Sequence, residues 1–139
     1  MKNPLLFLAF LFSFISMHSQ TIDDAFIIGK WKAKKATMIK NGDKPETKEY
    51  VDGFQKATFS FNADHTFSFE NKSDAKTMVM LAKMFNDKNK WIFDQKAMKI
   101  KIGKKGDGYS VASFSVTLKK DKIIFLVEET DIELVMKKQ

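Results

Sequence analysis

The chain has 139 residues, a formal net charge of +7 and 44% hydrophobic residues. It contains no cysteine, which excludes disulfide bonds, Cys–His catalysis and cysteine-ligated zinc sites. All 24 basic residues are lysine, whereas arginine is the usual side chain for bidentate contacts to phosphate and to guanine. Because these lysines are dispersed and often alternate with apolar residues, we interpret them as solvated strand faces and expect no nucleic-acid partner.

Residues 1–20 have the three-part layout of a secretory signal peptide. A short positive start containing Lys2 is followed by a nearly uninterrupted apolar run over residues 5–15 and then by a more polar exit. This run is shorter than the roughly 20 apolar residues that a transmembrane helix needs, and an uncleaved anchor is the alternative. We expect cleavage on one side or the other of Gln20.

Removal of this segment leaves residues 21–139 as one domain of 119 residues. That length supports a single hydrophobic core but not two. An aromatic content of 13% argues against disorder, because such a chain has enough apolar area to offset the entropy of ordering. Since there is no N-terminal cysteine to carry a lipid, we expect a secreted or periplasmic product without a stable membrane anchor.

The first part of this domain is expected to contain one long strand between irregular segments. Residues 21–28 are typical of a short helical or irregular lead, and a strand runs from Gly29 to residues 38–40. Residues 41–46 have turn chemistry, with Asn-Gly as the strongest pair. The polar residues 46–53 are expected to form a loop or a weak edge strand.

The clearest hairpin joins residues 57–61 to residues 66–70. Apolar and polar side chains alternate strictly in both segments, which is typical of strands that are buried on one face only. The turn between them contains Asp64 and His65. Because histidine tolerates positive φ, we interpret His65 as a turn residue rather than as half of an Asp64–His65 catalytic pair.

The alternation stops at residues 74–85, where apolar residues recur at helical spacing. We expect Ser73 to cap this helix. The helix carries Met78, Met80 and Met84, whose flexible side chains adapt to irregular apolar surfaces. It is expected to lie across one end of the strands, either as a plug that seals the core permanently or as a lid that opens for a ligand.

Alternating strands return after residue 89 and continue nearly to the last residue. Together with the earlier ones they give about eight strands that are mostly joined by hairpin turns and apolar on one face. We therefore predict an all-β fold, an eight-stranded antiparallel up-and-down barrel with one short helix at about 74–85. The alternative is a two-sheet sandwich, which needs long crossovers. The later strands are expected over residues 89–94, 98–102, 112–118, 123–127 and 132–137.

Three short motifs occur in matching order along the chain. Gly29-Lys30-Trp31 opens the first strand, and segments 61–67 and 90–100 supply the other two. Together they resemble the motifs of small secreted bacterial lipocalin-like (calycin) domains. The resemblance implies an up-and-down barrel that Trp31 closes at one end and that holds a small apolar ligand. Members of the family often place a late arginine across this tryptophan, where the present chain offers only Lys137 and Lys138.

The side chains that the alternation directs into the barrel are almost all aromatic. A small eight-stranded barrel is either filled by its side chains or holds one modest ligand, and both interpretations stay open. A ligand would be apolar or aromatic with few polar groups. Phe125 is also expected to point inward. The residues expected to contact a ligand are Trp31, Phe59, Phe61, Phe67, Phe69, Met78, Trp91, Phe93 and Phe114.

Other candidates for chemistry are weak. Glu128 and Glu129 form an acidic pair for which we expect no convergent partner, and residues 103–108 lack the following helix of a phosphate-binding glycine loop. We therefore predict a secreted domain that is not an enzyme, has no cofactor or metal, and binds a small hydrophobic molecule. The alternative is a filled barrel that acts as a protein-interaction or inhibitory module through loops at 41–53 and 103–108. The sequence specifies no protein partner.

Overall fold

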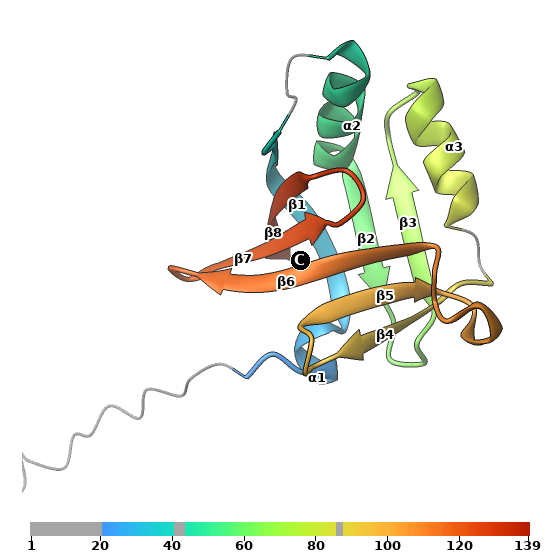
Figure 1. The fold of residues 1–139 in the computed structure, drawn as a ribbon, viewed down its shortest axis with the longest axis vertical. Helices are drawn as coiled ribbons and strands as arrows, with labels where there is room; N and C mark the ends of the chain where they lie inside the picture. The colour runs from blue at the N-terminus through green and yellow to red at the C-terminus, as the bar shows by residue number, and fades with distance from the viewer. Residues whose placement is uncertain (1–20, 41–43, 86–87) are drawn as a thin grey trace, which may run out of the picture.

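The computed structural model describes residues 21–40, 44–85 and 88–139, so the predicted signal peptide lies outside the described residues. The described chain forms one eight-stranded sheet that curls into a nearly closed barrel, with short helices at its ends (Figure 1). The strands are β1 (Gly29–Met38), β2 (Ala57–Phe61), β3 (Phe67–Asn71), β4 (Lys90–Asp94), β5 (Lys99–Gly103), β6 (Ala112–Lys119), β7 (Lys122–Val127) and β8 (Ile132–Lys138). The helices are α1 (Asp24–Ile27), α2 (Pro45–Gln55) and α3 (Lys76–Met84), with a short 3-10 helix, η2 (Lys105–Asp107).

The strands follow one another around the barrel in the order β3-β2-β1-β8-β7-β6-β5-β4. β1 pairs antiparallel with both β2 and β8, which joins the first and last strands of the barrel. The seam between β3 and β4 is bridged by the Thr66–Lys90 pair and by a 2.9 Å hydrogen bond from Trp91 N to His65 O. This arrangement confirms the predicted up-and-down barrel, and the single continuous sheet rules out the two-sheet sandwich.

Alternation in the β2–β3 hairpin produces a wholly aromatic inner face. The register places Phe59 opposite Phe69 and Phe61 opposite Phe67. All four side chains are at most 8% exposed. Residues two apart on a strand share a face, and directly opposite residues are close enough for their rings to pack. The hairpin therefore contributes two pairs of rings to the core.

The prediction of a loop or weak edge strand at residues 46–53 is wrong, because these residues form most of α2. Pro45 occupies the first turn, where its missing N–H costs no hydrogen bond. Thr47, Tyr50 and Phe54 are spaced by three and four residues and so share one face of the helix. Thr47 and Phe54 are buried, and Tyr50 packs against the core. Burial of this narrow face stabilises a helix that is otherwise polar.

α3 confirms the helix that was predicted at about 74–85, although the observed helix is slightly shorter. The expected cap is wrong: Ala75 occupies the N-cap position and makes no side-chain hydrogen bond there. Ser73 instead accepts a 3.2 Å hydrogen bond at Oγ from Ala75 N, before the helix begins. Met78 is buried, whereas Met80 and Met84 are exposed.

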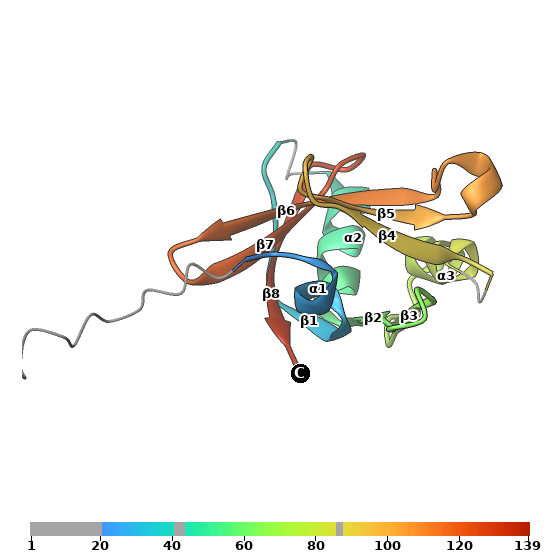
Figure 2. The same cartoon turned by 90° about the horizontal axis from the view of Figure 1, so that it is seen from below.

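The helices mark two ends of the barrel (Figures 1 and 2). α2 and α3 stand side by side over one end, which we call the helix end. α1 lies at the opposite end, beside the β2–β3 turn and the start of β1, and we call this the α1 end. Among the residues that the structure describes, no helix has the length and apolar character needed to cross a membrane.

Candidate functional site

The aromatic side chains predicted to meet a ligand form the core of the barrel. Eight of the nine predicted contacts are buried. Phe93 is the exception, since it is only partly buried, although it packs against the same core. The buried members are Trp31, Phe59, Phe61, Phe67, Phe69, Met78, Trp91 and Phe114.

Contacts between rings fill the centre of the barrel. The Phe61 ring centroid lies 5.1 Å from that of Phe67, 5.6 Å from that of Trp91 and 6.3 Å from that of Phe125. Phe114 extends the cluster, with its centroid 6.0 Å from that of Phe125. Separations of about 4.5–7 Å are those of directly packed rings. These side chains therefore occupy the space that a deep ligand would need.

A cavity of about 200 Å³ lies at the helix end, between α2, α3 and the rim of the barrel, and we call it the mouth cavity. Phe114 is the one predicted contact that lines it among the residues that the structure describes. Leu81, Met84 and Phe85 come from the segment that was predicted as a plug or lid, whereas no ligand contact was predicted for the remaining lining residues. The side chains that matter most for the argument below are Tyr50, Phe54, Leu81, Val111, Phe114 and Val127.

Sequence reasoning missed one wall of this cavity because it did not predict α2. Tyr50 and Phe54 are one helical turn apart, and both line the mouth cavity. Proline at a helix start, followed by aromatic residues at this spacing, is a recognisable helix pattern. That pattern in residues 45–55 was the available indication of a helix with an apolar face.

A buried methionine fixes α3 over the helix end. Met78 is 0% exposed and lies against Gly53 of α2, where an added Cβ would collide with the Met78 side chain. Glycine inside a helix costs about 1 kcal/mol relative to alanine, and this close approach explains why glycine occupies the position. The middle of α3 is therefore packed tightly against α2.

Trp31 closes the α1 end. Its side chain is 2% exposed, and its Nε1 donates a 2.8 Å hydrogen bond to Ile27 O. Lys138 Nζ lies 5.5 Å from the Trp31 ring centroid and donates a 2.7 Å hydrogen bond to Phe26 O. Gly29 has a φ of 138°, and an added Cβ there would meet Lys138 Cε at 2.7 Å. Gly29 thus leaves room for the Lys138 side chain, and this side chain packs across the Trp31 ring.

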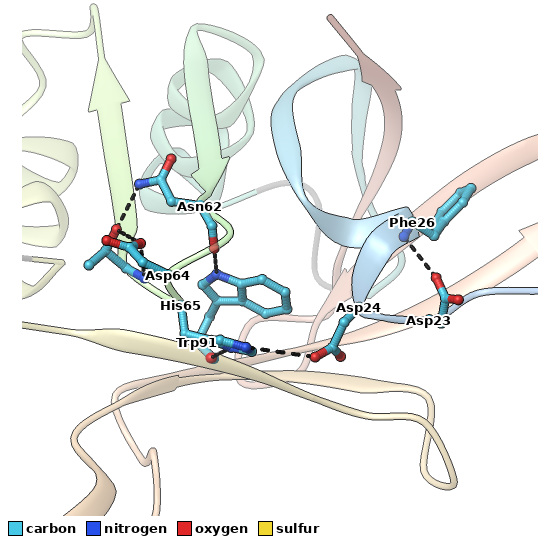
Figure 3. Close-up of polar contacts among 8 residues, drawn as sticks. Asp23, Asp24, Phe26, Asn62, Asp64, His65 and Trp91 are labelled. Atoms are coloured by element: carbon cyan, nitrogen blue, oxygen red, sulfur yellow. Dashed lines mark hydrogen bonds and ion pairs between the residues drawn. The ribbon is translucent and has the colours of Figure 1, made fainter.

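Figure 3 shows how the β2–β3 turn is held beside α1. Asp64 Oδ1 accepts hydrogen bonds from Thr66 Oγ1 (2.6 Å) and Thr66 N (3.0 Å), and these bonds lower the pKa of Asp64. His65 has a φ of 65°, which confirms the predicted turn conformation. His65 Nδ1 lies 2.9 Å from Trp91 O, and Nε2 lies 3.8 Å from Asp24 Oδ2. Asp64 therefore stabilises the turn, while His65 connects the turn to β4 and lies beside α1.

A polar cluster on the outer surface contradicts the expectation that Glu128 has no convergent partner. Its carboxylate accepts hydrogen bonds from Ser113 Oγ (2.6 Å) and Ser115 Oγ (2.7 Å) and pairs with Lys99 Nζ at 2.7 Å. The hydrogen bond from Lys99, followed by those from the two serines, lowers the pKa of Glu128 from 4.5 to about 2. Because Ser113 and Ser115 flank the buried Phe114, they share the outer face of β6 beside Glu128.

Comparisons with known proteins place the chain in no family. No protein-family model, no curated protein and no solved structure matches it. The described residues also contain no group of three or more histidine, cysteine, aspartate or glutamate side chains that could hold a metal ion. The function is therefore inferred from the chemistry of the described surfaces and cavities.

Proposed function

We propose that this chain is an exported lipocalin-like domain that binds a small hydrophobic molecule without chemically changing it. The observation that carries the proposal is the mouth cavity, a space of about 200 Å³ at one end of a filled barrel. Leu81, Phe114 and Val127 supply apolar walls. Removal of apolar surface from water contributes roughly 25 cal/mol per Å², so a ligand would be held mainly by burial.

The volume of the mouth cavity limits the size of the ligand. An engineered protein cavity of about 150 Å³ holds benzene, whereas sites for drug-sized molecules span about 300–1,000 Å³. A space of about 200 Å³ suits a single ring or a short branched chain. The polar lining residues are Tyr50, Ser113, Glu129 and Thr130, but apolar residues predominate, so we expect a mainly apolar ligand.

The lipocalin-like assignment rests on the α1 end and on the order of the strands. A Gly-x-Trp motif opens β1, and a lysine from β8 packs across its tryptophan. The proposal that the domain is secreted or periplasmic rests on the sequence of residues 1–20. N-terminal sequencing of the protein recovered outside the cytoplasm is expected to begin at Gln20 or Thr21. Recovery of full-length chain with the membranes would contradict export as a free domain.

Native mass spectrometry of the purified protein is the first test of ligand binding. We expect an added mass from a co-purified small molecule, or binding of a small fluorescent apolar probe to the unoccupied protein. The variant Val111→Phe places a ring in the wall of the mouth cavity and is expected to weaken binding at least tenfold. Ile124→Phe on β7 adds the same ring away from this cavity and is expected to bind normally.

Absence of both a co-purified molecule and probe binding would overturn the proposal. Equal binding by Val111→Phe and Ile124→Phe would place any ligand elsewhere. The lid hypothesis for α3 is tested in the same sample by hydrogen exchange. Ligand is expected to slow exchange at Leu81 and its neighbours while leaving α1 unchanged, whereas uniform protection without ligand would leave α3 as a plug.

A second candidate function is a filled barrel that acts as a protein-interaction or inhibitory module. It is favoured by the ring-filled interior and by three exposed apolar side chains on α3, namely Val79, Met80 and Met84. Of the two loops first expected to carry it, residues 45–53 belong to α2 instead. This candidate predicts that Met80→Lys abolishes partner binding while Val111→Phe has no effect on it.

A further inference from the structure

A second and larger depression lies at the α1 end, away from the mouth cavity. It has a volume of about 560 Å³ and is formed where the β6–β7 hairpin extends past the barrel beside β1 and β8 (Figures 1 and 2). We call it the hairpin groove. Its volume falls within the range of about 300–1,000 Å³ that is usual for small-molecule sites, whereas that of the mouth cavity does not.

The floor of the hairpin groove is a row of apolar side chains from three adjacent strands. Leu118 of β6 pairs with Ile123 of β7, which pairs in turn with Met136 of β8. All three line the groove, together with Trp31. Leu118 is 43% exposed, although it lies on the face of β6 that is buried farther along the strand. The floor therefore presents apolar surface to solvent in a half-enclosed space.

The rim of the hairpin groove is strongly basic. Five lysines and a single acidic residue, Asp121, are among its lining residues. Lys138 is held by its hydrogen bond to Phe26 O. The other four lysines form no ion pair within the described residues. They are Lys34, Lys35, Lys122 and Lys137.

A β-bulge helps to concentrate this charge. The register of β1 against β8 shifts between Ala33 and Lys35, so Lys34 is the extra residue of the bulge. In a regular strand consecutive side chains point to opposite faces, whereas a bulge re-aims the side chains around it. Lys34 and Lys35 both line the groove at this bulge.

We propose that the hairpin groove binds a single-chain anionic amphiphile, with its acyl chain on the Leu118–Ile123–Met136 floor and its carboxylate, sulfate or phosphate among the rim lysines. The apolar floor provides for the chain, and the unpaired lysines provide for the headgroup. A volume of about 560 Å³ accommodates a free molecule, and this is the occupant that we propose. This site is separate from the mouth cavity, so neither proposal depends on the other.

Isothermal titration with three single-chain probes below their micelle concentrations tests the proposal. Dodecanoate is expected to bind at least tenfold more tightly than dodecanol, which has the same chain without the charge, and than dodecyltrimethylammonium. The Lys34→Gln/Lys122→Gln/Lys137→Gln variant is expected to lose this preference and to bind dodecanoate and dodecanol alike. Leu118→Asn, at a half-exposed position where folding tolerates the change, is expected to weaken both about tenfold.

Matched variants separate the groove from general basicity and from the mouth cavity. Lys48→Gln/Lys104→Gln/Lys105→Gln removes the same charge from exposed lysines that do not line the hairpin groove and is expected to keep the full preference for dodecanoate. Val111→Phe, which blocks the mouth cavity, is expected to have no effect on dodecanoate binding. Equal affinity for dodecanoate and dodecanol, loss of dodecanoate binding in Val111→Phe, or binding to phosphatidylglycerol vesicles without binding to free dodecanoate would each overturn the proposal.

Discussion

At the scale of single residues, the Gly-x-Trp motif acts through a side chain from the other end of the sequence. Lys138 Nζ sits over two rings, 5.6 Å from the Phe26 centroid and 5.5 Å from that of Trp31. Its stem passes so close to Gly29 that a side chain there would collide with it. The motif therefore supplies one side of a contact, and Lys138, one of the two late lysines that the resemblance pointed to, supplies the other side.

Substitution of Lys138 separates its charge from its stem. Lys138→Met keeps an unbranched stem but removes the ammonium group. We expect the free energy of unfolding to fall by about 1 kcal/mol, because the cation–π contact and the hydrogen bond to Phe26 O are lost. Lys138→Arg is expected to remain within about 0.5 kcal/mol of the natural chain. Urea denaturation measures both variants. Lys137→Met is the control, and an equal loss there would show that the ring contact contributes nothing.

Glu128 makes the stability of the fold depend on pH. Its pKa is about 2 in the folded protein instead of 4.5, so the carboxylate stabilises the fold above about pH 4.5 and this stabilisation is lost as the pH falls toward 2. The full shift corresponds to roughly 3 kcal/mol, and partial solvent contact reduces the expected contribution to about 1–2 kcal/mol.

The Glu128→Gln variant tests this dependence. It is expected to unfold at lower denaturant concentration at pH 7, with the difference from the natural chain shrinking between pH 4.5 and pH 2. Glu129→Gln changes the exposed neighbouring residue and provides the control. A difference for Glu128→Gln that is constant across this pH range would contradict the assignment.

At the scale of elements, the sequence of the β6–β7 hairpin fits its conformation poorly. Lys120 and Asp121 have φ values of 47° and 65°, and Lys119 pairs directly with Lys122 across the turn. Two successive residues with positive φ are typical of a type I′ turn, which strongly prefers Asn-Gly. The hairpin therefore combines an unfavourable turn sequence with facing like charges.

The double variant Lys120→Asn/Asp121→Gly supplies the preferred turn sequence. It is expected to raise the free energy of unfolding by about 0.5–1 kcal/mol, because Asn and Gly adopt positive φ with less strain. Gly108→Ala tests the reverse change at a φ of 66° with open space around it and is expected to lose about 1 kcal/mol. Denaturant midpoints that are unchanged in both variants would show that these turns carry no strain.

At the scale of the whole molecule, the strands could be predicted from the sequence much better than the helices or the cavities. Period-2 alternation identified the eight strands, because each is buried on one face and exposed on the other. α2 was missed because its apolar face consists of a few residues among charged ones and is stabilised by the barrel rather than by local propensity. The ring contacts that fill the interior depend on distances between strands, which periodicity does not contain.

The ring cluster is expected to dominate the stability of the fold. Phe61 contacts rings from three other strands. Phe61→Ala is therefore expected to lower the free energy of unfolding by about 3–5 kcal/mol, because burial is lost and a cavity is left unfilled. Phe93→Ala removes the same side chain from a partly buried position and is expected to cost less than half as much. Guanidinium denaturation measures both, and equal losses would show that the centre of the barrel is not close-packed.

The pairing of β1 with β8 also sets the order in which the barrel can be completed. One partner of β1 is made soon after it, but the other is the last strand of the barrel to be synthesised. Until β8 emerges, β1 keeps one unpaired edge, and Trp31 lacks the lysine that packs over it. Under the proposed export, we therefore expect the barrel to close only after β8 has crossed the membrane, because β1 can then pair on both of its edges.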